Sequence, residues 1–551
     1  MKDAPGPMVL SGNIADVVSG RTFAGRVEVA AERIARVVET GPAQAGAPWF
    51  TPGLVDAHVH VESTMLAPSE FARVAVTHGT VATVSDPHEI ANVLGVAGVR
   101  WMLADAQRAA CKIFFGAPSC VPATSFETAG AKFGAKEVGE LLDDPAIRYL
   151  SEVMNFPGVI YGDATMRAIV AEAKKRGKPV DGHAPGVRGE DLKKYVAAGI
   201  QTDHECTTLD EAREKAALGM KIWIREGSAA RNFEALWPLL LERPELCGLC
   251  SDDKHPDELL VSQIDELVRR AVAHGVPVMD ALRAATLNPV RHYGLPVGLL
   301  QANDPADIIE VGDLRNFKVK RTWVNGRLVA EEGRPLAARV TVTPVNVFHA
   351  GPKRAADFQW RAQAGKKVRV IEAIDGQIVT GETVETPKVT AEGMVACDTG
   401  RDLLKLTVVN RYADAPPEVA LVRNFGLKRG ALASSVAHDS HNVVAVGTSD
   451  EELARAVNLV IRHGGGLSFA SGETEKALPL PIAGLMATGD AATVGAAYRE
   501  LSELARAAGC GLKAPYMCLS FLALLVIPQL KLSDKGLFDV GKFSLVEPWV
   551  D

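Results

Sequence analysis

Cysteine is scarce in this sequence, with 8 residues in a chain of 551. The eight are scattered, and only Cys247 and Cys250 lie close enough to form a C-x-x-C motif. Because no second pair completes a four-ligand zinc site and the neighbouring residues are apolar, we interpret this motif as structural. The scattered positions exclude a disulfide framework and are typical of a protein from a reducing compartment.

An excess of positive charge and long apolar runs are also missing. Lysine and arginine number 60 against 67 aspartate and glutamate, a net charge of −7, which argues against nucleic acid or an anionic membrane as a partner. The first residues lack the apolar core of a signal peptide. The longest apolar stretch, residues 517–528, is well short of the roughly 20 residues that a membrane span needs. We therefore expect a cytoplasmic protein that acts on a small molecule.

The length and a composition of 47% hydrophobic and 23% charged residues predict a folded protein of about three structural units. Two β-rich blocks flank a long middle segment. The first, residues 1–50, has short apolar strands between turn residues. The second, residues 303–345, has the strong hairpin turn Asn325-Gly326 between two apolar runs. We predict that the two blocks form one small composite β-sandwich domain.

Residues 51–302 alternate apolar runs with amphipathic stretches, which is the βα pattern of a parallel sheet. Eight candidate strands within about 200 residues fit a (β/α)8 TIM-like barrel. An open doubly wound sheet is disfavoured because no glycine-rich phosphate loop follows the first strand. The strands are predicted at residues 54–60, 81–85, 112–118, 149–152, 180–183, 201–204, 220–225 and 246–251. Residues 346–551 have a different sequence pattern, which predicts an additional C-terminal α/β domain. The predicted fold class is therefore α/β.

Histidines at the ends of these predicted strands are the most informative feature. His58 and His60 end the first strand, and alternate residues of a strand face the same side. His183 and His204 end the fifth and sixth strands, and Asp252 follows the eighth. Since the C-terminal strand ends of a barrel converge on one mouth, this pattern predicts a metal site there.

Four imidazoles and a carboxylate exceed what one catalytic ion usually takes from a protein, so we predict two divalent ions. Glu152, which ends the fourth strand, is the candidate for a bridging ligand. The segment SDPHE after the second strand offers Asp86, His88 and Glu89. Glu89 could move a proton between water and substrate, although acidic residues at a helix N-terminus also serve the helix dipole.

Further candidates for contacts with the substrate or support of the ligands are Ser63, Asp253, His438 and His441. The last two belong to the segment HDSHN in the C-terminal domain. That segment could close the active-site mouth, contact the substrate, hold a third metal or form a turn network that fixes a loop. The pattern slightly favours the turn network.

The segments that hold these residues resemble the amidohydrolase superfamily and, within it, the bacterial adenine deaminases. The H-x-H pair marks only the superfamily, whereas the segments SDPHE and HDSHN point to this one family. The resemblance covers nearly the whole chain, and it is carried by PGLVDAHVHVEST, TVATVSDPHEIANVLG, SEVMNFPGV, DGHAPG, DHECTT, CSDDKHPDEL, NFGLKRGALASSVAHDSHNVVAVG, LPLPIAGLM and SFLALLVIPQLKLSDKGLFDV.

The resemblance implies hydrolytic deamination of adenine to hypoxanthine and ammonia, by attack of a metal-activated hydroxide at C6. It implies two ions, Mn(II) or Fe(II) with Zn(II) as an alternative, and a role for Asp252 as ligand or base and for Glu89 as proton shuttle. The metal ligands that it implies are His58, His60, Glu152, His183 and His204. Many members of the superfamily carry a carboxylated lysine on the fourth strand; none is present here, which counts against hydantoinase-like activity. We expect adenine and water as the only partners besides a second copy of the chain in a homodimer.

Two other functions stay open at this point. The same two-metal hydrolase could act on another aminopurine or on a cyclic amide. A catalytically inactive barrel could serve as a binding scaffold, but the presence of all six proposed metal-site residues argues against it.

Overall fold

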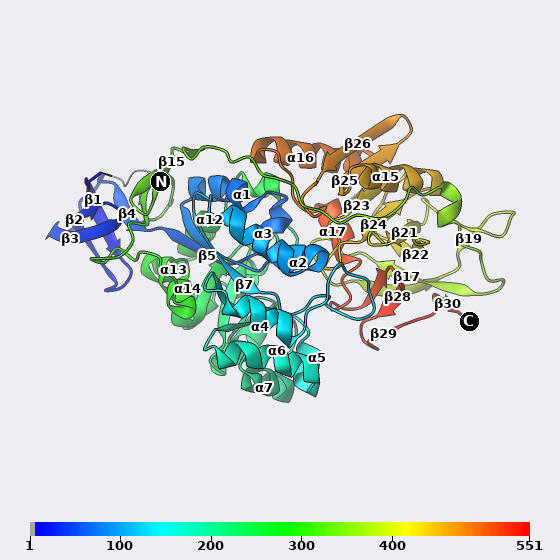
Figure 1. Cartoon of the computed structure of the whole chain (residues 1–551), viewed down its shortest axis with the longest axis horizontal. Coiled ribbons are helices and arrows are strands. Elements are labelled where there is room, and N and C mark those ends of the chain that lie inside the picture. Colours follow the sequence, from blue (N-terminus) through cyan, green and yellow to red (C-terminus); the bar gives the residue numbers. More distant parts are fainter. Residues whose placement is uncertain (1–5) are drawn as a thin grey trace.

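The computed structural model describes residues 6–551. Figure 1 shows three regions along the long axis of the molecule: a sheet that contains the N-terminal strands, a middle region of parallel strands and helices, and a C-terminal region of strands and helices.

The two segments that flank the middle region pair in one eight-stranded sheet. Its strands are β1 (Met8–Asp16), β2 (Arg21–Ala30), β3 (Arg33–Gly41), β4 (Trp49–Pro52), β13 (Ile308–Val311), β14 (Val319–Val324), β15 (Arg327–Glu331) and β16 (Arg334–Pro335). β4 joins the two flanks, because it runs parallel to β1 and antiparallel to β13. Asn325 (φ 49°) and Gly326 (φ 72°) form the predicted turn between β14 and β15, where left-handed backbone suits an Asn-Gly pair. The hydrogen bonds thus join both flanking segments in one continuous sheet, where a β-sandwich was predicted.

Eight parallel strands occupy the middle region, and each overlaps a strand predicted from the sequence. Five form one sheet: β5 (Leu54–Val59), β6 (Thr80–Ser85), β7 (Lys112–Ala117), β8 (Ile147–Val153) and β9 (Val180–Gly182). Three form another: β10 (Thr202–Asp203), β11 (Lys221–Arg225) and β12 (Cys247–Cys250). The end of β12 lies beside β5, because Asp252 forms a parallel bridge with Val59 and its N–H donates to the carbonyl of His58 at 2.9 Å.

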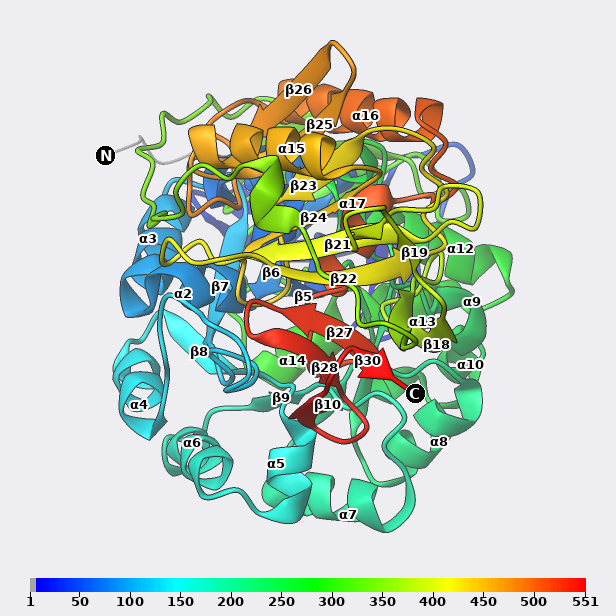
Figure 2. The same ribbon diagram turned by 90° about the vertical axis from the view of Figure 1, so that its right-hand side faces the viewer.

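Helices cover the outside of these strands. Figure 2 shows this arrangement for α4 (Ala135–Asp143), α6 (Ala164–Lys175), α7 (Gly189–Ala198) and α8 (Leu209–Ala217). The side chains of Asp163 and Thr208 cap α6 and α8 by accepting the N–H groups of Met166 and Glu211. All residues of β5 and β6 are buried, as expected for parallel strands that are covered on both faces.

The C-terminal region contains a nine-stranded mixed sheet. Its strands are β17 (Lys367–Glu372), β18 (Gly381–Glu385), β21 (Leu404–Val409), β22 (Glu418–Arg423), β23 (Ala431–Ser434), β24 (Val443–Gly447), β25 (Gly466–Ser471), β26 (Thr474–Pro479) and β30 (Trp549–Val550). The helices α15 (Asp450–Arg462), α16 (Ala491–Ala507) and α17 (Pro515–Phe521) pack with it. Residues 517–527 of the apolar stretch are buried, as expected for core, and only its last residue, Pro528, is exposed. Within residues 6–551, no helix is long and apolar enough to cross a membrane.

The C-terminal region packs against the end of the parallel strands at which the predicted site residues lie. Met65, which follows the short 3-10 helix Val61–Thr64 after β5, accepts the N–H of Ala487 at 2.8 Å, and Leu66 forms a parallel bridge with Ala487. One apolar cluster contains side chains of both regions. In Figure 2 the strands β21, β22, β27 (Leu530–Ser533) and β28 (Gly536–Asp539) lie in front of the parallel strands.

Candidate active site

Each predicted metal-ligating side chain lies at or directly after the C-terminal end of a parallel strand, and all of them are buried. They are His58 and His60 on and after β5, Glu152 on β8, His183 after β9, His204 after β10 and Asp252 after β12. The structure therefore brings together all six residues that the strand-end pattern singled out.

Glu152 lies at the centre of the cluster. Its Oε2 is 2.7 Å from Nδ1 of His183 and 3.1 Å from Nε2 of His204, while its Oε1 is 3.3 Å from Nε2 of His60. Nε2 of His60 is in turn 3.2 Å from Nε2 of His58. Burial favours the neutral form of Glu152, but His183 and the other imidazoles hold the pKa of this carboxyl well below its usual range.

Asp252 divides its two oxygens between the cluster and a buried arginine. Oδ1 is 3.3 Å from Nε2 of His60, and Oδ2 accepts a hydrogen bond from Arg225 at 2.6 Å. Arg225, the last residue of β11, also pairs with Glu205, whose Oε2 accepts from Nη2 at 2.8 Å. Burial opposes ionisation of Asp252, yet Arg225 and the imidazoles hold its pKa well below its usual range. Sequence reasoning missed Arg225 and Glu205, and the position of Glu205 next to His204 was the only available signal.

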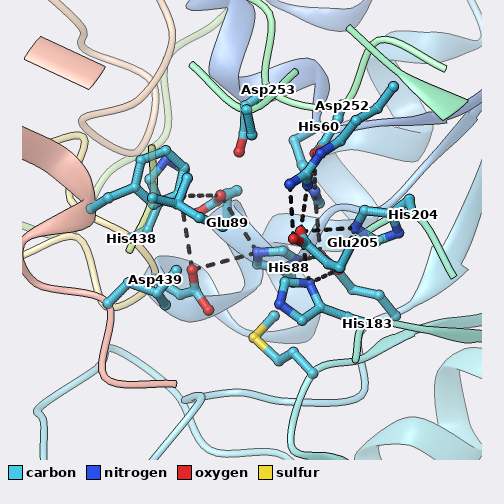
Figure 3. A pocket seen from close by; sticks show the side chains of 17 residues that line it. His60, His88, Glu89, His183, His204, Glu205, Asp252, Asp253, His438 and Asp439 are labelled. Atoms are coloured by element: carbon cyan, nitrogen blue, oxygen red, sulfur yellow. Dashed lines mark hydrogen bonds and ion pairs between the residues drawn. The ribbon is translucent and has the colours of Figure 1, made fainter. Parts of the chain in front are cut away.

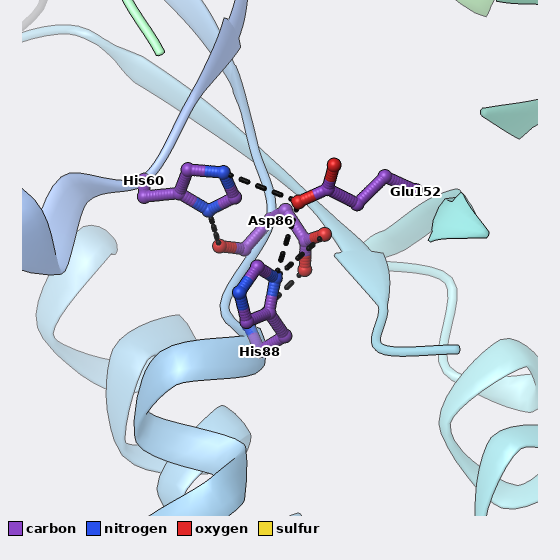
Figure 4. A group of neighbouring side chains, drawn as sticks. All are labelled: His60, Asp86, His88 and Glu152. Atoms are coloured by element: carbon purple, nitrogen blue, oxygen red, sulfur yellow. Dashed lines mark hydrogen bonds and ion pairs between the residues drawn. The ribbon is translucent and has the colours of Figure 1, made fainter. Parts of the chain in front are cut away.

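Asp86 and His88 extend the cluster from the end of β6 (Figure 4). His88, the first residue of α2 (His88–Leu94), has Nδ1 3.1 Å from Oδ2 of Asp86 and 3.5 Å from Oε1 of Glu152. The backbone carbonyl of Asp86 lies 3.2 Å from Nδ1 of His60, which orients that ring and leaves its Nε2 directed at Glu152. The predicted helix after SDPHE is divided at Gly95 into α2 and α3 (Val96–Ala106).

The donor set of this cluster fits a divalent metal. Ligand atoms within 4.8 Å of one another form several groups, among them His60, Asp86, His88 and Glu152, and His58, His204 and Asp252. Nδ1 of His58 and Nε2 of His183 are buried without a hydrogen-bond partner among the described residues. Imidazole and carboxylate are the ligands that Mn, Fe and Zn accept in proteins.

The segment HDSHN lies at this site, and it contacts Glu89 of α2. Nδ1 of His438 is 2.6 Å from Oε1 of Glu89, and Nε2 of His441 forms a short hydrogen bond with Oε2. Burial would raise the pKa of Glu89, but His438, His441 and His88 hold it well below its usual range. The segment also forms the turn hydrogen bonds that were predicted, since the N–H of His441 donates to the carbonyl of Ala437 at 2.8 Å. The contacts with Glu89 come in addition, because sequence pattern alone does not reveal how the C-terminal region packs on the strand ends.

A cavity is lined by residues of the cluster, several of which Figure 3 labels, and by apolar side chains. Its apolar lining consists of Met154, Ala230, Ile378, Phe521 and Leu524. The rings of Phe521 and His438 are stacked, with centroids 4.6 Å apart and an angle of 14° between their planes. Asp253 also lines the cavity, and its Oδ1 accepts the hydroxyl of Ser63 at 2.5 Å. A polar cluster that faces apolar and aromatic side chains suits a flat, polar heterocycle.

Comparison with known proteins assigns the family. Residues 49–329 match the model of the amidohydrolase family, and residues 377–544 match that of the adenine deaminase C-terminal domain. An adenine deaminase from Salinibacter ruber is 54% identical over 551 residues, covering 99% of this chain and 100% of that protein. The chain belongs to the adenine deaminase family. Other adenine deaminases are similar over nearly the full length: that of Methanosarcina acetivorans is 50% identical over 97% of this chain and 98% of its own.

Membership of the adenine deaminase family also accounts for the two-part construction of the site. The strand ends that carry the candidate metal-ligating side chains fall within the amidohydrolase match. His438, His441 and Phe521 fall within the match to the adenine deaminase C-terminal domain. The residues that contact Glu89 thus belong to the region that characterises adenine deaminases.

Proposed function

We propose that this protein deaminates adenine hydrolytically, with hypoxanthine and ammonia as products. The buried cluster of imidazoles and carboxylates opposite an apolar wall is the observation that carries the proposal, because it suits attack by water on a flat heterocycle. Relatives that are named adenine deaminases and match nearly the full length support adenine as the substrate.

The ligand set that we propose binds two divalent ions, with Mn(II) or Fe(II) preferred over Zn(II). Glu152 would help to hold them with both of its oxygens, since Oε1 faces His60 while Oε2 faces His183 and His204. The full set is His58, His60, Glu152, His183, His204 and Asp252, with Asp86 and His88 supporting it from β6. Divalent ions bound there lower the pKa of water from 15.7 toward about 7.

Two carboxylates then move the protons. Asp252 accepts a proton from the attacking water through Oδ1, because Oδ2 is held by Arg225. Glu89, which is ionised in the free site, takes up the second proton of the attacking water and passes it to the ring nitrogen beside C6, which limits the negative charge that builds up on the ring as the C6–O bond forms. The proton held by Asp252 then passes to the amino group, and the C6–N bond breaks to release ammonia. Positioned acid–base groups of this kind contribute about 10²–10⁴-fold to rate.

The architecture that we propose for this reaction is a (β/α)8 barrel of residues 51–302 with a β-domain of residues 1–50 and 303–345 and a C-terminal α/β domain of residues 346–551. The bridge between Val59 and Asp252 supports closure of the barrel. Eight unpaired cysteines support a cytoplasmic location. The homodimer stays a prediction that sedimentation can test.

The experiment that tests the function is an adenine deamination assay on protein expressed with Mn(II) and an iron chelator. Ammonia release and bound metal are measured on the same sample, beside a panel of other aminopurines and hydantoins. We expect adenine to be the preferred substrate and about two ions per chain. Turnover of a panel member in preference to adenine would refute the substrate, and protein without bound transition metal would refute the metal-dependent mechanism.

A further inference from the structure

One carboxylate that lines the cavity has an oxygen without a hydrogen-bond partner among the described residues. Asp439 is 2% exposed and lines the cavity. Its Oδ1 lies 3.8 Å both from Nε2 of His88 and from Nδ1 of His438, which is beyond hydrogen-bond distance. Its Oδ2 is buried and has no hydrogen-bond partner among residues 6–551. A buried carboxylate without donors is unfavourable, so a donor on a bound molecule is the natural partner.

The position of Asp439 restricts which donor can reach it. Figure 3 shows Asp439 and Asp252 on opposite sides of the cavity, with Glu89 on the side of Asp439. The reacting carbon must lie near Asp252 if that residue accepts the proton of the attacking water. One edge of the substrate then lies against the wall that HDSHN and Phe521 build, where Glu89 also lies.

We propose that Asp439 determines the specificity for a free purine base by accepting the N–H of the five-membered ring. This inference rests on the proposed function, since it takes C6 of adenine as the reacting carbon. An ionised carboxylate only accepts hydrogen bonds, and in a free purine base the five-membered ring carries one N–H. A nucleoside carries its sugar at that nitrogen, so Asp439 meets a carbon substituent there instead of a donor.

The apolar wall strengthens this assignment. Ile378, Phe521 and Leu524 come from the same C-terminal region as Asp439 and line the cavity with it. These side chains make apolar contacts with the faces of the purine. Asp439, the carboxylate of HDSHN, accepts a hydrogen bond at the edge of the purine. Three other carboxylates outside the proposed ligand set line the cavity, and each has a partner: Glu205 pairs with Arg225, Glu89 with His438 and His441, and Asp253 accepts the hydroxyl of Ser63. Asp439 is therefore the acceptor that is left for the substrate.

The test compares adenine with 9-methyladenine, which lacks the N–H, in wild-type protein and in Asp439→Ala. Loss of a hydrogen bond to a charged group corresponds to about a 10–100-fold change. We expect the KM for adenine to rise by about that factor in Asp439→Ala. The preference for adenine over 9-methyladenine in kcat/KM should fall at least about tenfold, because the acceptor is gone and the methyl group gains room. Asp439→Asn, which keeps the shape of the side chain, should lose part of the preference.

The matched control is Ser440→Ala. Ser440 is the next residue of the same segment and is buried, but it does not line the cavity. We expect this variant to keep the wild-type preference for adenine. Equal loss of preference in Ser440→Ala and Asp439→Ala would overturn the proposal, because the effect would then come from the segment and not from the carboxylate.

Three further results decide the matter. An unchanged preference in Asp439→Ala that retains its metal and its circular dichroism spectrum would overturn the proposal and leave the deamination of adenine standing. Loss of bound metal from Asp439→Asn would identify Asp439 as a ligand and overturn the proposal as well. If wild-type protein did not turn over adenine, the proposed function would fail; calorimetric binding of hypoxanthine against 9-methylhypoxanthine would still test Asp439 by itself.

Discussion

Replacing Lys531 by methionine should remove a dependence of stability on pH that the wild-type protein shows between pH 7 and 10.5. Lys531 lies on β27 with its side chain fully buried. Its ammonium donates to the carbonyls of Ile378 and Phe521, each at 2.9 Å, and both of those residues line the cavity. No carboxylate pairs with it in the described part of the chain, and burial lowers its pKa from 10.5 to about 7.

The magnitude follows from the difference in proton binding. Between pH 7 and 10.5 the unfolded chain keeps the proton of Lys531 while the folded chain loses it, so the free energy of unfolding rises with pH. A shift of about 3.5 pKa units corresponds to roughly 5 kcal/mol over the whole range. Between pH 7 and 9 the gain is about 2 kcal/mol, half of the folded molecules being still protonated at pH 7. Below pH 7 both states are protonated, and this dependence ends.

The assay is urea unfolding of wild-type protein and Lys531→Met at pH 7 and pH 9. The free energy of unfolding of the wild type minus that of the variant should increase by about 2 kcal/mol between the two conditions. Lys542→Met, which removes an exposed lysine nearby, controls for the change in net charge. A difference that is the same at both pH values would show that Lys531 keeps its proton in the folded state, and the reasoning from burial would be refuted.

Substitutions at four other residues test the roles assigned above. Glu89→Gln and Asp252→Asn should each lower kcat at least about 100-fold with bound metal unchanged, since each removes an acid–base group; near-normal turnover would take that residue out of the mechanism. His441→Ala should act through Glu89, lowering kcat and shifting its pH profile while the KM for adenine stays close to wild type, and a variant with an unaltered profile would contradict this. Arg225→Met should lower the free energy of unfolding, measured in urea, by about 3–5 kcal/mol, because two buried carboxylates lose their cation. Arg225→Lys should recover part of this free energy. An equal loss in both variants would show that the effect comes from the packing of the arginine side chain and not from its charge.

The strands and the strand-end residues could be predicted from the sequence because both depend on local pattern. A strand such as β6 is buried on both faces, so it appears as a run of valine, alanine, threonine and serine without a charged residue, and the segment with Asp86 and His88 follows it. His58 and His60 point to the same side because they alternate on β5. The structure brings these residues together because parallel strands end at one edge, and no long-range contact had to be inferred.

Contacts between distant segments could not be predicted in the same way. Glu89 and His441 are separated by most of the chain, and nothing near either residue indicates the other. Arg225 looks like the end of an amphipathic strand, and only the neighbouring strands show that it faces Glu205 and Asp252. Lys531 looks like a surface residue of a hairpin until the segment that contains Ile378 covers it.

The position of β4 in the composite sheet has a consequence for synthesis of the chain on the ribosome. β4 needs β13 as its antiparallel neighbour, so the N-terminal strands cannot complete their sheet until about residue 311 has emerged. By then every candidate metal ligand has already been made, since the last of them is Asp252. The nascent chain can therefore capture metal well before His438 and His441 emerge to hold Glu89, and its hydrolytic competence comes only with the last quarter of translation.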